Sequence, residues 1–438
     1  MESEERSGRR KALKGRIGKA ATALFGMERG GGDGMSRLAL LGGKPLREKP
    51  FPRWPVFGEE EERALIEVLR SGKWGALDGE RVKRFQERFA AFQEAKFGVC
   101  VVNGTVALEV ALRAAGVEPG DEVIVPAYTF IATATACLAV GARPVFADVD
   151  PETLQIDPRD ASKKVTERTR AIIPVHLGGH PADMDAVGDL ARRYNLMVIE
   201  DAAQAHGAAW RQRRVGAIGH LGAFSFQSSK NMTAGEGGIV LTNDERLADA
   251  AWSIHNVGRV QKGKWYQHER IGWNLRMTEF QAAVLLCQLE RMEEMIRLRE
   301  QNAAALSRLF AELPGVRPVG SDPRATTHAW HLYLFRYDRQ AFSGLSKEGF
   351  VRALQAEGIP VSPGYVPLNR NRAIRRELAK RFGAGEEAIP PCPEAERAGD
   401  EEVLWFPQRV LLGSHRDLAD VAEAIDKVRR HAAELVGA

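Results

Sequence analysis

The sequence has few cysteines, and they are scattered. Its 438 residues contain four of them, Cys100, Cys137, Cys287 and Cys392, and no two form a C-x-x-C pair. This spacing argues against a disulfide framework or a cysteine-based zinc site and indicates reduced thiols in a cytoplasmic setting. No run of about 18 apolar residues occurs, so we expect no membrane span.

A strong excess of one charge is also missing. The formal net charge is +4, and much of it lies in the first 20 residues, where arginine and lysine are dense. The remainder is near neutral, so nothing supports a nucleic-acid-binding surface. The sequence also lacks a P-loop, a G-x-S-x-G motif and a G-x-G-x-x-G motif after a strand.

Residues 1–35 differ in composition from the rest of the chain. A basic stretch over 9–25 favours a short amphipathic helix, and the glycines of 30–34 are typical of a linker. We expect a disordered basic extension, or a gene start placed too early with Met35 as the initiator. A targeting or membrane-surface role is the alternative, although the segment lacks the apolar core of a signal peptide.

From about residue 59 onward, the pattern alternates between helix and strand. This alternation predicts a largely parallel sheet covered on both faces, with ligands at the carboxyl ends of its strands. A long amphipathic helix is expected from Thr278 to about Leu306, followed by a smaller α+β region. We therefore expect a large domain over 36–295 and a small one over 296–438. Long segments over 360–371 and 383–393 suit substrate-facing loops or plain surface loops.

One lysine stands in a polar, glycine-rich turn between two apolar strands expected over 222–227 and 238–242. Lys230 at such a strand end is either a solvated loop residue or partly desolvated. Desolvation lowers the pKa of an amine, and a neutral amine attacks an aldehyde to form a Schiff base. Asp201 ends another buried strand, one loop and one strand earlier. A lysine and a carboxylate on neighbouring strand ends are the pair that binds pyridoxal 5'-phosphate (PLP), because the carboxylate keeps the pyridine nitrogen protonated.

Other polar and aromatic residues at strand ends fit the same cofactor. Gly104 and Thr105 begin a predicted helix whose N-terminus suits a phosphate, although Thr105 is equally a candidate N-cap. Ser225 offers a further hydroxyl to that phosphate. An aromatic residue of the segment 126–130 can stack on the ring, or it can simply pack at a helix start. Gln204 suits the phenolic oxygen of the cofactor, or a solvated turn.

A metal site is a weaker hypothesis. His176 and His180 form an H-x-x-x-H pattern near carboxylates. The two glycines and the proline around them break the helix that would bring both rings to one face. We therefore expect no metal.

Taken together, the motifs resemble the DegT/StrS family of PLP-dependent sugar aminotransferases. The resemblance runs from about residue 38 to the C-terminus and depends on motifs in order: Asn-Gly-Thr (103–105), Pro-x-Tyr-Thr-Phe (126–130), Pro-Val-His-Leu-x-Gly (174–179), Glu-Asp-Ala-Ala-Gln (200–204), Ser-Phe-x-x-x-Lys (225–230), Gly-Glu-Gly-Gly (235–238) and Asn-Leu-Arg-Met-Thr-Glu-Phe-Gln-Ala-Ala (274–283). It implies the type I (aspartate aminotransferase-like) α/β fold. In that fold a large domain with a mainly parallel seven-stranded sheet precedes a smaller C-terminal α+β domain.

The resemblance also implies roles for single residues. Lys230 would form the Schiff base, Asp201 would bind the pyridinium, and Gln204 would contact the ring oxygen. The remaining cofactor contacts would be a stacking ring and the phosphate ligands: Phe130 for the ring, and Gly104, Thr105 and Ser225 for the phosphate. Asn274 would reach the phosphate in the neighbouring subunit of a homodimer. The partner of the donor's carboxylate stays open among Arg259, Arg270 and Arg276.

The implied activity is transfer of an amino group from L-glutamine or L-glutamate to a keto-sugar or keto-cyclitol, with pyridoxamine 5'-phosphate between the two half-reactions. Amino-sugar, aminocyclitol, polysaccharide or antibiotic biosynthesis would be the setting. Three segments have sequences that look closest to the branch of the family that acts on keto-cyclitols, namely residues 225–231, 364–368 and 392–396. Two alternatives remain: a related dehydratase or aromatising enzyme, and a PLP-binding regulator without turnover. In sugar dehydratases of the family, histidine typically replaces the lysine, so Lys230 argues against that role.

Overall fold

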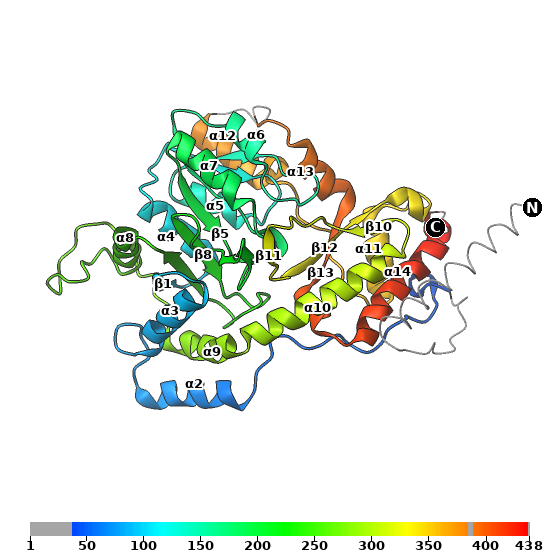
Figure 1. Cartoon of the computed structure of the whole chain (residues 1–438), viewed down its shortest axis with the longest axis horizontal. Coiled ribbons are helices and arrows are strands. Elements are labelled where there is room, and N and C mark those ends of the chain that lie inside the picture. The colour runs from blue at the N-terminus through cyan, green and yellow to red at the C-terminus, as the bar shows by residue number, and fades with distance from the viewer. Residues whose placement is uncertain (1–36, 384–388, 437–438) are drawn as a thin grey trace, which may run out of the picture.

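The computed structural model describes residues 37–383 and 389–436 (Figure 1). The extension expected over 1–35 lies outside these residues, as do residues 384–388 of the loop expected over 383–393. Within the described ranges, no helix is both long and apolar enough to cross a membrane.

A seven-stranded sheet forms the centre of the large domain, with strand order β1-β9-β8-β5-β4-β2-β3. β9 runs antiparallel to both of its neighbours, and the pairs from β8 to β3 are all parallel. The prediction of a mainly parallel seven-stranded sheet is therefore confirmed. The strands are β1 (Phe97–Val101), β2 (Glu122–Pro126), β3 (Arg143–Ala147), β4 (Thr169–Ile172), β5 (Met197–Asp201), β8 (Leu221–Ser225) and β9 (Gly238–Thr242).

Helices cover both faces of this sheet, as buried parallel strands require. One face packs against α4 (Gly104–Ala114), α5 (Ala132–Ala139) and α8 (Glu245–His255). The other face packs against α3 (Arg81–Phe92), α7 (Met184–Tyr194) and α9 (Glu279–Glu290). Two further helices complete this domain, α2 (Glu59–Ser71), which packs on α9, and the short α6 (Pro158–Lys163).

The C-terminal part of the chain is built on a small antiparallel sheet of order β10-β12-β13. Its strands are β10 (Val316–Pro318), β12 (Leu332–Tyr337) and β13 (Val403–Pro407). A separate apolar cluster joins this sheet to α10 (Met292–Ala311), α11 (Lys347–Ala356) and α14 (His415–Val436). The helices α12 (Arg372–Phe382) and α13 (Pro393–Arg397) lie instead beside the large domain (Figure 1). A third sheet of three short strands, β6 (Ala209–Trp210), β7 (Arg213–Arg214) and β11 (Ala325–Thr327), connects the two parts.

The first described segment belongs by packing to the C-terminal cluster. Leu38 and Phe51 are buried in that cluster, and Arg47 pairs with Asp417 at 2.6 Å and with Asp420 at 2.7 Å on α14. The chain then passes beneath α10 and enters the large domain at α2 (Figure 1). The division at residues 295 and 296 stays a prediction.

The helix expected from Thr278 to about Leu306 is interrupted. α9 ends at Glu290 and α10 begins at Met292, with Arg291 between them held by ion pairs to Glu60 and Glu61. Because apolar residues recur at helical spacing on both sides of Arg291, the sequence pattern does not reveal that this one residue separates two helices.

Candidate active site

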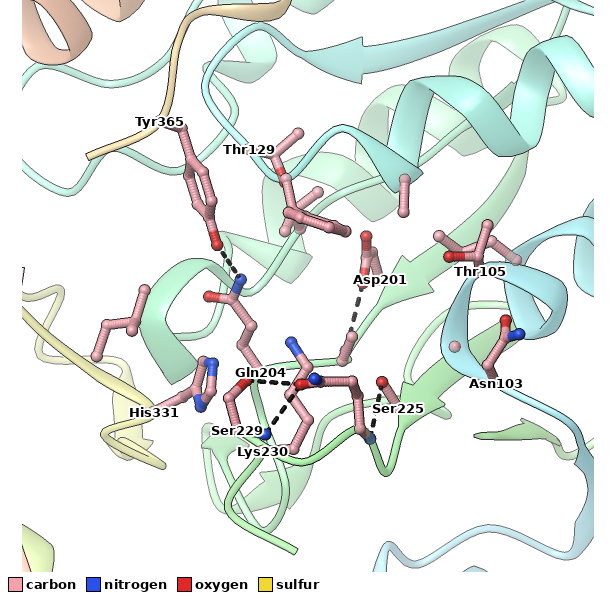
Figure 2. Close-up of a pocket in the computed structure, with 18 of the residues that line it drawn as sticks. Asn103, Thr105, Thr129, Asp201, Gln204, Ser225, Ser229, Lys230, His331 and Tyr365 are labelled. Atoms are coloured by element: carbon pink, nitrogen blue, oxygen red, sulfur yellow. Dashed lines mark hydrogen bonds between the residues drawn. The ribbon is translucent and has the colours of Figure 1, made fainter. Parts of the chain in front are cut away.

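A cavity of about 600 Å³ opens where the carboxyl ends of the parallel strands face the small domain. Seven of the eight predicted site residues line it: Gly104, Thr105, Phe130, Asp201, Gln204, Ser225 and Lys230. Figure 2 shows Asp201, Ser225 and Lys230 around one space, with Tyr365 and His331 on the opposite wall. The eighth, Asn274, is exposed and lies outside this cavity, in a segment that pairs with Asn256.

The N-terminus of α4 forms one end of the cavity. Asn103 caps the helix by accepting a hydrogen bond from the Val106 N–H at 2.9 Å, and the N–H groups of Gly104 and Thr105 have no partner within the helix. A Cβ at Gly104 would lie 2.5 Å from the Cβ of Ser225, and one at Gly238 would lie 2.4 Å from the Asn103 carbonyl oxygen. The two glycines thus let the strand end approach the helix, which creates a cradle suited to a phosphate.

Asp201 ends β5 with its carboxylate in the floor of the cavity. Thr133 donates a hydrogen bond to it at 2.8 Å, and the Ala203 N–H donates another at 3.3 Å. Burial raises the pKa of Asp201, and these hydrogen bonds and the charge of Lys230 oppose the increase. A cationic ring nitrogen beside this carboxylate would stabilise its ionised form, which burial alone disfavours.

Lys230 follows β8 in a turn closed by its own N–H, which donates to the Gln227 carbonyl at 2.9 Å. Burial lowers the pKa of its amine to about 8, and the Asp201 carboxylate opposes the decrease. At neutral pH, a fraction of the amine is therefore uncharged and nucleophilic. Because β5 and β8 are neighbouring parallel strands, the carboxylate and the lysine reach the same space.

Two histidines near the lysine are held neutral. His206 packs against Phe89 and Phe224, and burial together with the charge of Lys230 lowers its pKa to about 3. His331 lines the cavity, and its Nδ1 lies 3.1 Å from the Asn231 Oδ1. Since the Asn231 amide nitrogen donates to a backbone carbonyl, its oxygen is the acceptor, and His331 carries its proton on Nδ1. Among the described residues that line the cavity, Lys230 is thus the only cation.

The wall that faces the sheet comes from the small domain and was not predicted residue by residue. Tyr365 accepts a hydrogen bond from the Gln204 Nε2 at 3.1 Å, and its ring lies 6.1 Å from that of Phe130, which is half exposed. Burial raises the pKa of Tyr365 to about 12. His331, Trp405 and Gln408 complete this wall. The only signal in the sequence was the Gly-Tyr-x-Pro-Leu segment, which contains Tyr365.

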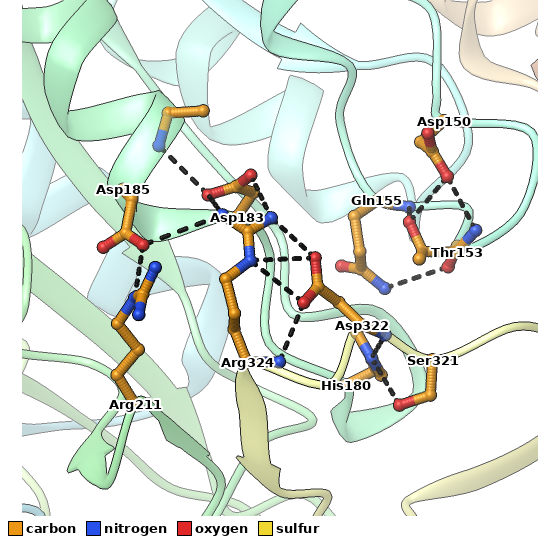
Figure 3. Close-up of polar contacts among 11 residues, drawn as sticks. Asp150, Thr153, Gln155, His180, Asp183, Asp185, Arg211, Ser321, Asp322 and Arg324 are labelled. Atoms are coloured by element: carbon orange, nitrogen blue, oxygen red, sulfur yellow. Dashed lines mark hydrogen bonds and ion pairs between the residues drawn. The ribbon is translucent and has the colours of Figure 1, made fainter.

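The two histidines of the H-x-x-x-H pattern have separate partners. His176 accepts a hydrogen bond from the Ala182 N–H at 3.0 Å, and its Nε2 lies 2.9 Å from the Glu200 carboxylate. His180 instead bonds to Ser321 at 3.0 Å and accepts from the Asp322 N–H at 3.1 Å (Figure 3). In the ranges 37–383 and 389–436, no cluster of three or more histidine, cysteine, aspartate or glutamate residues is arranged to hold a metal.

The three arginines considered for the donor's carboxylate lie elsewhere. Arg276 donates to the Asn256 side chain at 2.7 Å, Arg270 pairs with Asp249 at 3.2 Å, and none of the three lines the cavity of its own chain.

Comparison with known proteins agrees with this geometry. A Streptoalloteichus tenebrarius protein, named provisionally as an L-glutamine:3-amino-2,3-dideoxy-scyllo-inosose aminotransferase, is 40% identical over 412 residues, which cover 90% of this chain and 98% of that protein. The L-glutamine:2-deoxy-scyllo-inosose aminotransferase of the same organism is 39% identical over 91% of this chain and 99% of its own length. The crystal structure of a 3-amino-5-hydroxybenzoic acid synthase superposes with a TM-score of 0.79 at 36% identity, over 88% of this chain and 99% of that one. The model of the DegT/DnrJ/EryC1/StrS aminotransferase family matches residues 55–426, and the chain belongs to this family of PLP-dependent enzymes.

Proposed function

We propose that this protein transfers the amino group of L-glutamine to the keto group of a cyclitol, with PLP as its cofactor and pyridoxamine 5'-phosphate as the form between the half-reactions. One observation carries the proposal: a lysine of lowered pKa, a buried carboxylate and a glycine-dependent helix N-terminus surround one cavity. These groups match the aldehyde, the pyridine nitrogen and the phosphate of the cofactor. Relatives whose names specify L-glutamine and scyllo-inosose derivatives support the choice of donor and acceptor.

In this proposal, the large domain holds the cofactor. The N–H groups of Gly104 and Thr105 and the hydroxyl of Ser225 bind the phosphate, and Asp201 binds the ring nitrogen. Phe130 stacks on the ring, and Gln204 binds its phenolic oxygen. When bound, PLP withdraws electrons from the carbon that carries the amino group, so that this carbon can lose a proton.

Lys230 has two tasks. Its neutral amine would hold the cofactor through the aldehyde between turnovers and would be released when the donor's amine takes its place. The Lys230 Nζ, once released, would be the base that takes the proton from the α-carbon of the donor and the acid that returns it to C4′ of the cofactor. A pKa near 8 suits both tasks, because the amine accepts and releases a proton close to neutral pH.

A second candidate function is formation of an aromatic amino acid. It is favoured by the likeness to 3-amino-5-hydroxybenzoate synthase, which is 38% identical over 87% of this chain. Lys230 is present here, as that activity requires, so the lysine does not separate the two functions. The acceptor does: the first activity gives an aminocyclitol, and the second gives a product that absorbs in the near ultraviolet.

We further propose a homodimer in which Asn274 of each chain completes the phosphate site of the other. The exposure of Asn274 and its position outside the lining of its own cavity support this. So does the strongly exposed apolar surface nearby, where Trp265 is 78% exposed, Tyr266 75% and Ile271 82%. The four cysteines, none of them in a disulfide, support a cytoplasmic location.

The absorption spectrum of the purified protein tests the function. We expect a band at about 410–430 nm that is replaced by one near about 330 nm on addition of L-glutamine, and that returns on addition of 2-deoxy-scyllo-inosose. Lys230→Ala should abolish turnover, because Lys230 is the only lysine among the described residues that line the cavity. A protein that shows no such band after incubation with PLP, or a Lys230→Ala variant with multiple turnovers, would refute the proposal.

A further inference from the structure

Arg299 of α10 is a buried cation without an acidic partner. Its side chain is fully buried, and no carboxylate within the described ranges pairs with it. Arg47, another buried arginine, is neutralised by Asp417 and Asp420. The Trp54 ring, whose centroid lies 5.6 Å from the Arg299 Cζ, offsets only part of the cost of burying this charge, which a carboxylate would neutralise as at Arg47.

The guanidinium of Arg299 is directed at Gln408. Its Nε and Nη2 donate to the Gln408 Oε1 at 2.9 and 2.7 Å, and its Nη1 has no hydrogen-bond partner. Burial lowers the pKa of Arg299 to about 9, which leaves the group charged at neutral pH. A charged donor with an unused N–H group therefore lies directly behind Gln408.

This contact determines which way the Gln408 amide faces. A guanidinium has only donors, so the amide oxygen must be turned toward it, and the amide nitrogen is left for the other side. Gln408 lines the active-site cavity, and its backbone N–H donates to the His331 carbonyl at 3.1 Å, which holds it beside that histidine. The small-domain wall thus offers an N–H donor whose amide is polarised by a cation.

Apart from what the neighbouring subunit of the proposed dimer adds, the described lining of the cavity has no other group for an anionic substrate. Lys230 is committed to the cofactor, His206 and His331 are neutral, and no arginine is among the described residues that line the cavity. An amino-acid donor nevertheless brings an α-carboxylate, whereas a keto-cyclitol has none.

We propose that Gln408 and Arg299 form the subsite for the α-carboxylate of the amino donor. The Gln408 amide donates to the carboxylate, and Arg299 is a positioning residue that fixes the amide and supplies the charge behind it. The inference rests on the proposed aminotransferase function, and it predicts that only the donor half-reaction depends on this pair.

Gln408→Glu is the sharpest variant for this subsite. The new carboxylate has the same shape and pairs with Arg299, so the fold keeps a satisfied buried contact. It removes the donor N–H, cancels the positive charge and places a negative group toward the substrate. Arg299→Met removes the charge together with both hydrogen bonds to the amide, and Arg299→Lys keeps the charge without the two-pronged contact.

The first half-reaction is followed by absorption with L-glutamine and with L-glutaminol, in which a CH₂OH group replaces the carboxylate. We expect the wild type to prefer L-glutamine. Gln408→Glu should lower kcat/KM for L-glutamine by about 10- to 100-fold, the effect of one hydrogen bond to a charged group, and leave L-glutaminol within about 2-fold. Arg299→Met should act in the same direction, and Arg299→Lys should fall between it and the wild type.

Two controls separate this subsite from a structural role. The second half-reaction, started from the pyridoxamine 5'-phosphate form with 2-deoxy-scyllo-inosose, should stay within about 2-fold in Gln408→Glu. The thermal unfolding midpoint of Gln408→Glu should not fall. Equal losses for both donors, or an unchanged preference for L-glutamine, would overturn the inference while the function stands. A wild-type protein that does not react with L-glutamine at all would instead refute the function proposed for the cavity.

Discussion

Gly104→Ala tests the cradle at the N-terminus of α4. The added Cβ would lie 2.5 Å from the Cβ of Ser225 and 3.0 Å from its Oγ, whereas carbon atoms in contact prefer about 3.5–4.0 Å. The helix and the strand end must therefore separate by about 1 Å. The N–H groups of α4 and the Ser225 hydroxyl cannot then all stay within hydrogen-bond distance of one phosphate.

We expect the affinity for PLP to fall by about 10- to 100-fold, which corresponds to the loss of one charge-assisted hydrogen bond. Overpacking should also lower the free energy of unfolding by about 1–3 kcal/mol. The assay is titration of the apoprotein with PLP, followed by the absorption of the lysine-bound cofactor. Thermal unfolding of the same samples shows that the variant is folded at the temperature of the titration.

Gly188→Ala is the matched control, because it adds the same methyl group inside α7. There the nearest atom to the new Cβ is the Arg192 Nη1 at 3.4 Å, at the flexible end of a long side chain. Alanine is the better helix former, so this variant should gain up to about 1 kcal/mol and bind PLP normally. Wild-type PLP affinity in Gly104→Ala would show that the helix N-terminus and Ser225 do not hold the phosphate.

Three further changes probe other parts of the structure. The rate at which PLP combines with the apoprotein should rise with pH to a plateau with a midpoint near 8, because only the neutral amine of Lys230 reacts. Asp201→Asn should lower this midpoint, since the carboxylate favours the ammonium form of the lysine. A midpoint near the ordinary pKa of lysine would contradict the argument that burial lowers the pKa of Lys230. A mixture of Lys230→Ala and Asn274→Ala chains, refolded together, should recover roughly a quarter of the wild-type activity, because each mixed dimer has one complete site; no recovery would exclude a shared site. Glu279→Gln should lower the free energy of unfolding by about 1–2 kcal/mol in urea titrations. The buried Glu279 carboxylate caps α3 by accepting hydrogen bonds from the Arg81 and Val82 N–H groups at 2.8 and 2.9 Å. An unchanged urea midpoint would show that this cap is dispensable.

The cofactor side of the cavity was predictable from the sequence because its residues lie in short motifs at strand ends. Asp201 ends β5 and Ser225 ends β8, and parallel strands bring their carboxyl ends to one edge of the sheet. Local pattern and sheet topology were therefore enough to gather these side chains. The roles assigned to them stay predictions until cofactor binding is measured.

The break between α9 and α10 was not predictable, because it depends on contacts made outside the helices. Arg291 interrupts an apolar pattern that continues on both sides, and its partners Glu60 and Glu61 belong to α2, far away in the sequence. The same limit explains Glu279, which caps α3 across the fold, while the α3 N-cap residue Glu80 makes no capping hydrogen bond. No local motif reports a cap that arrives from a distant segment.

The positions of the side chains in the small-domain wall of the cavity depend in the same way on how the small domain packs against the large one. Tyr365 bonds to Gln204 and His331 to Asn231, so each of these side chains is positioned by a partner on the large domain. Gln408 is oriented by Arg299 of α10. From the sequence of that helix alone, Arg299 would be expected to be an ordinary solvent-exposed arginine. In the proposed function, the cofactor contacts come from the sheet and the substrate contacts from this docked wall, so substitutions in the wall should change the substrate while the cofactor site stays intact. The proposal therefore assigns substrate specificity to residues whose positions no single motif specifies.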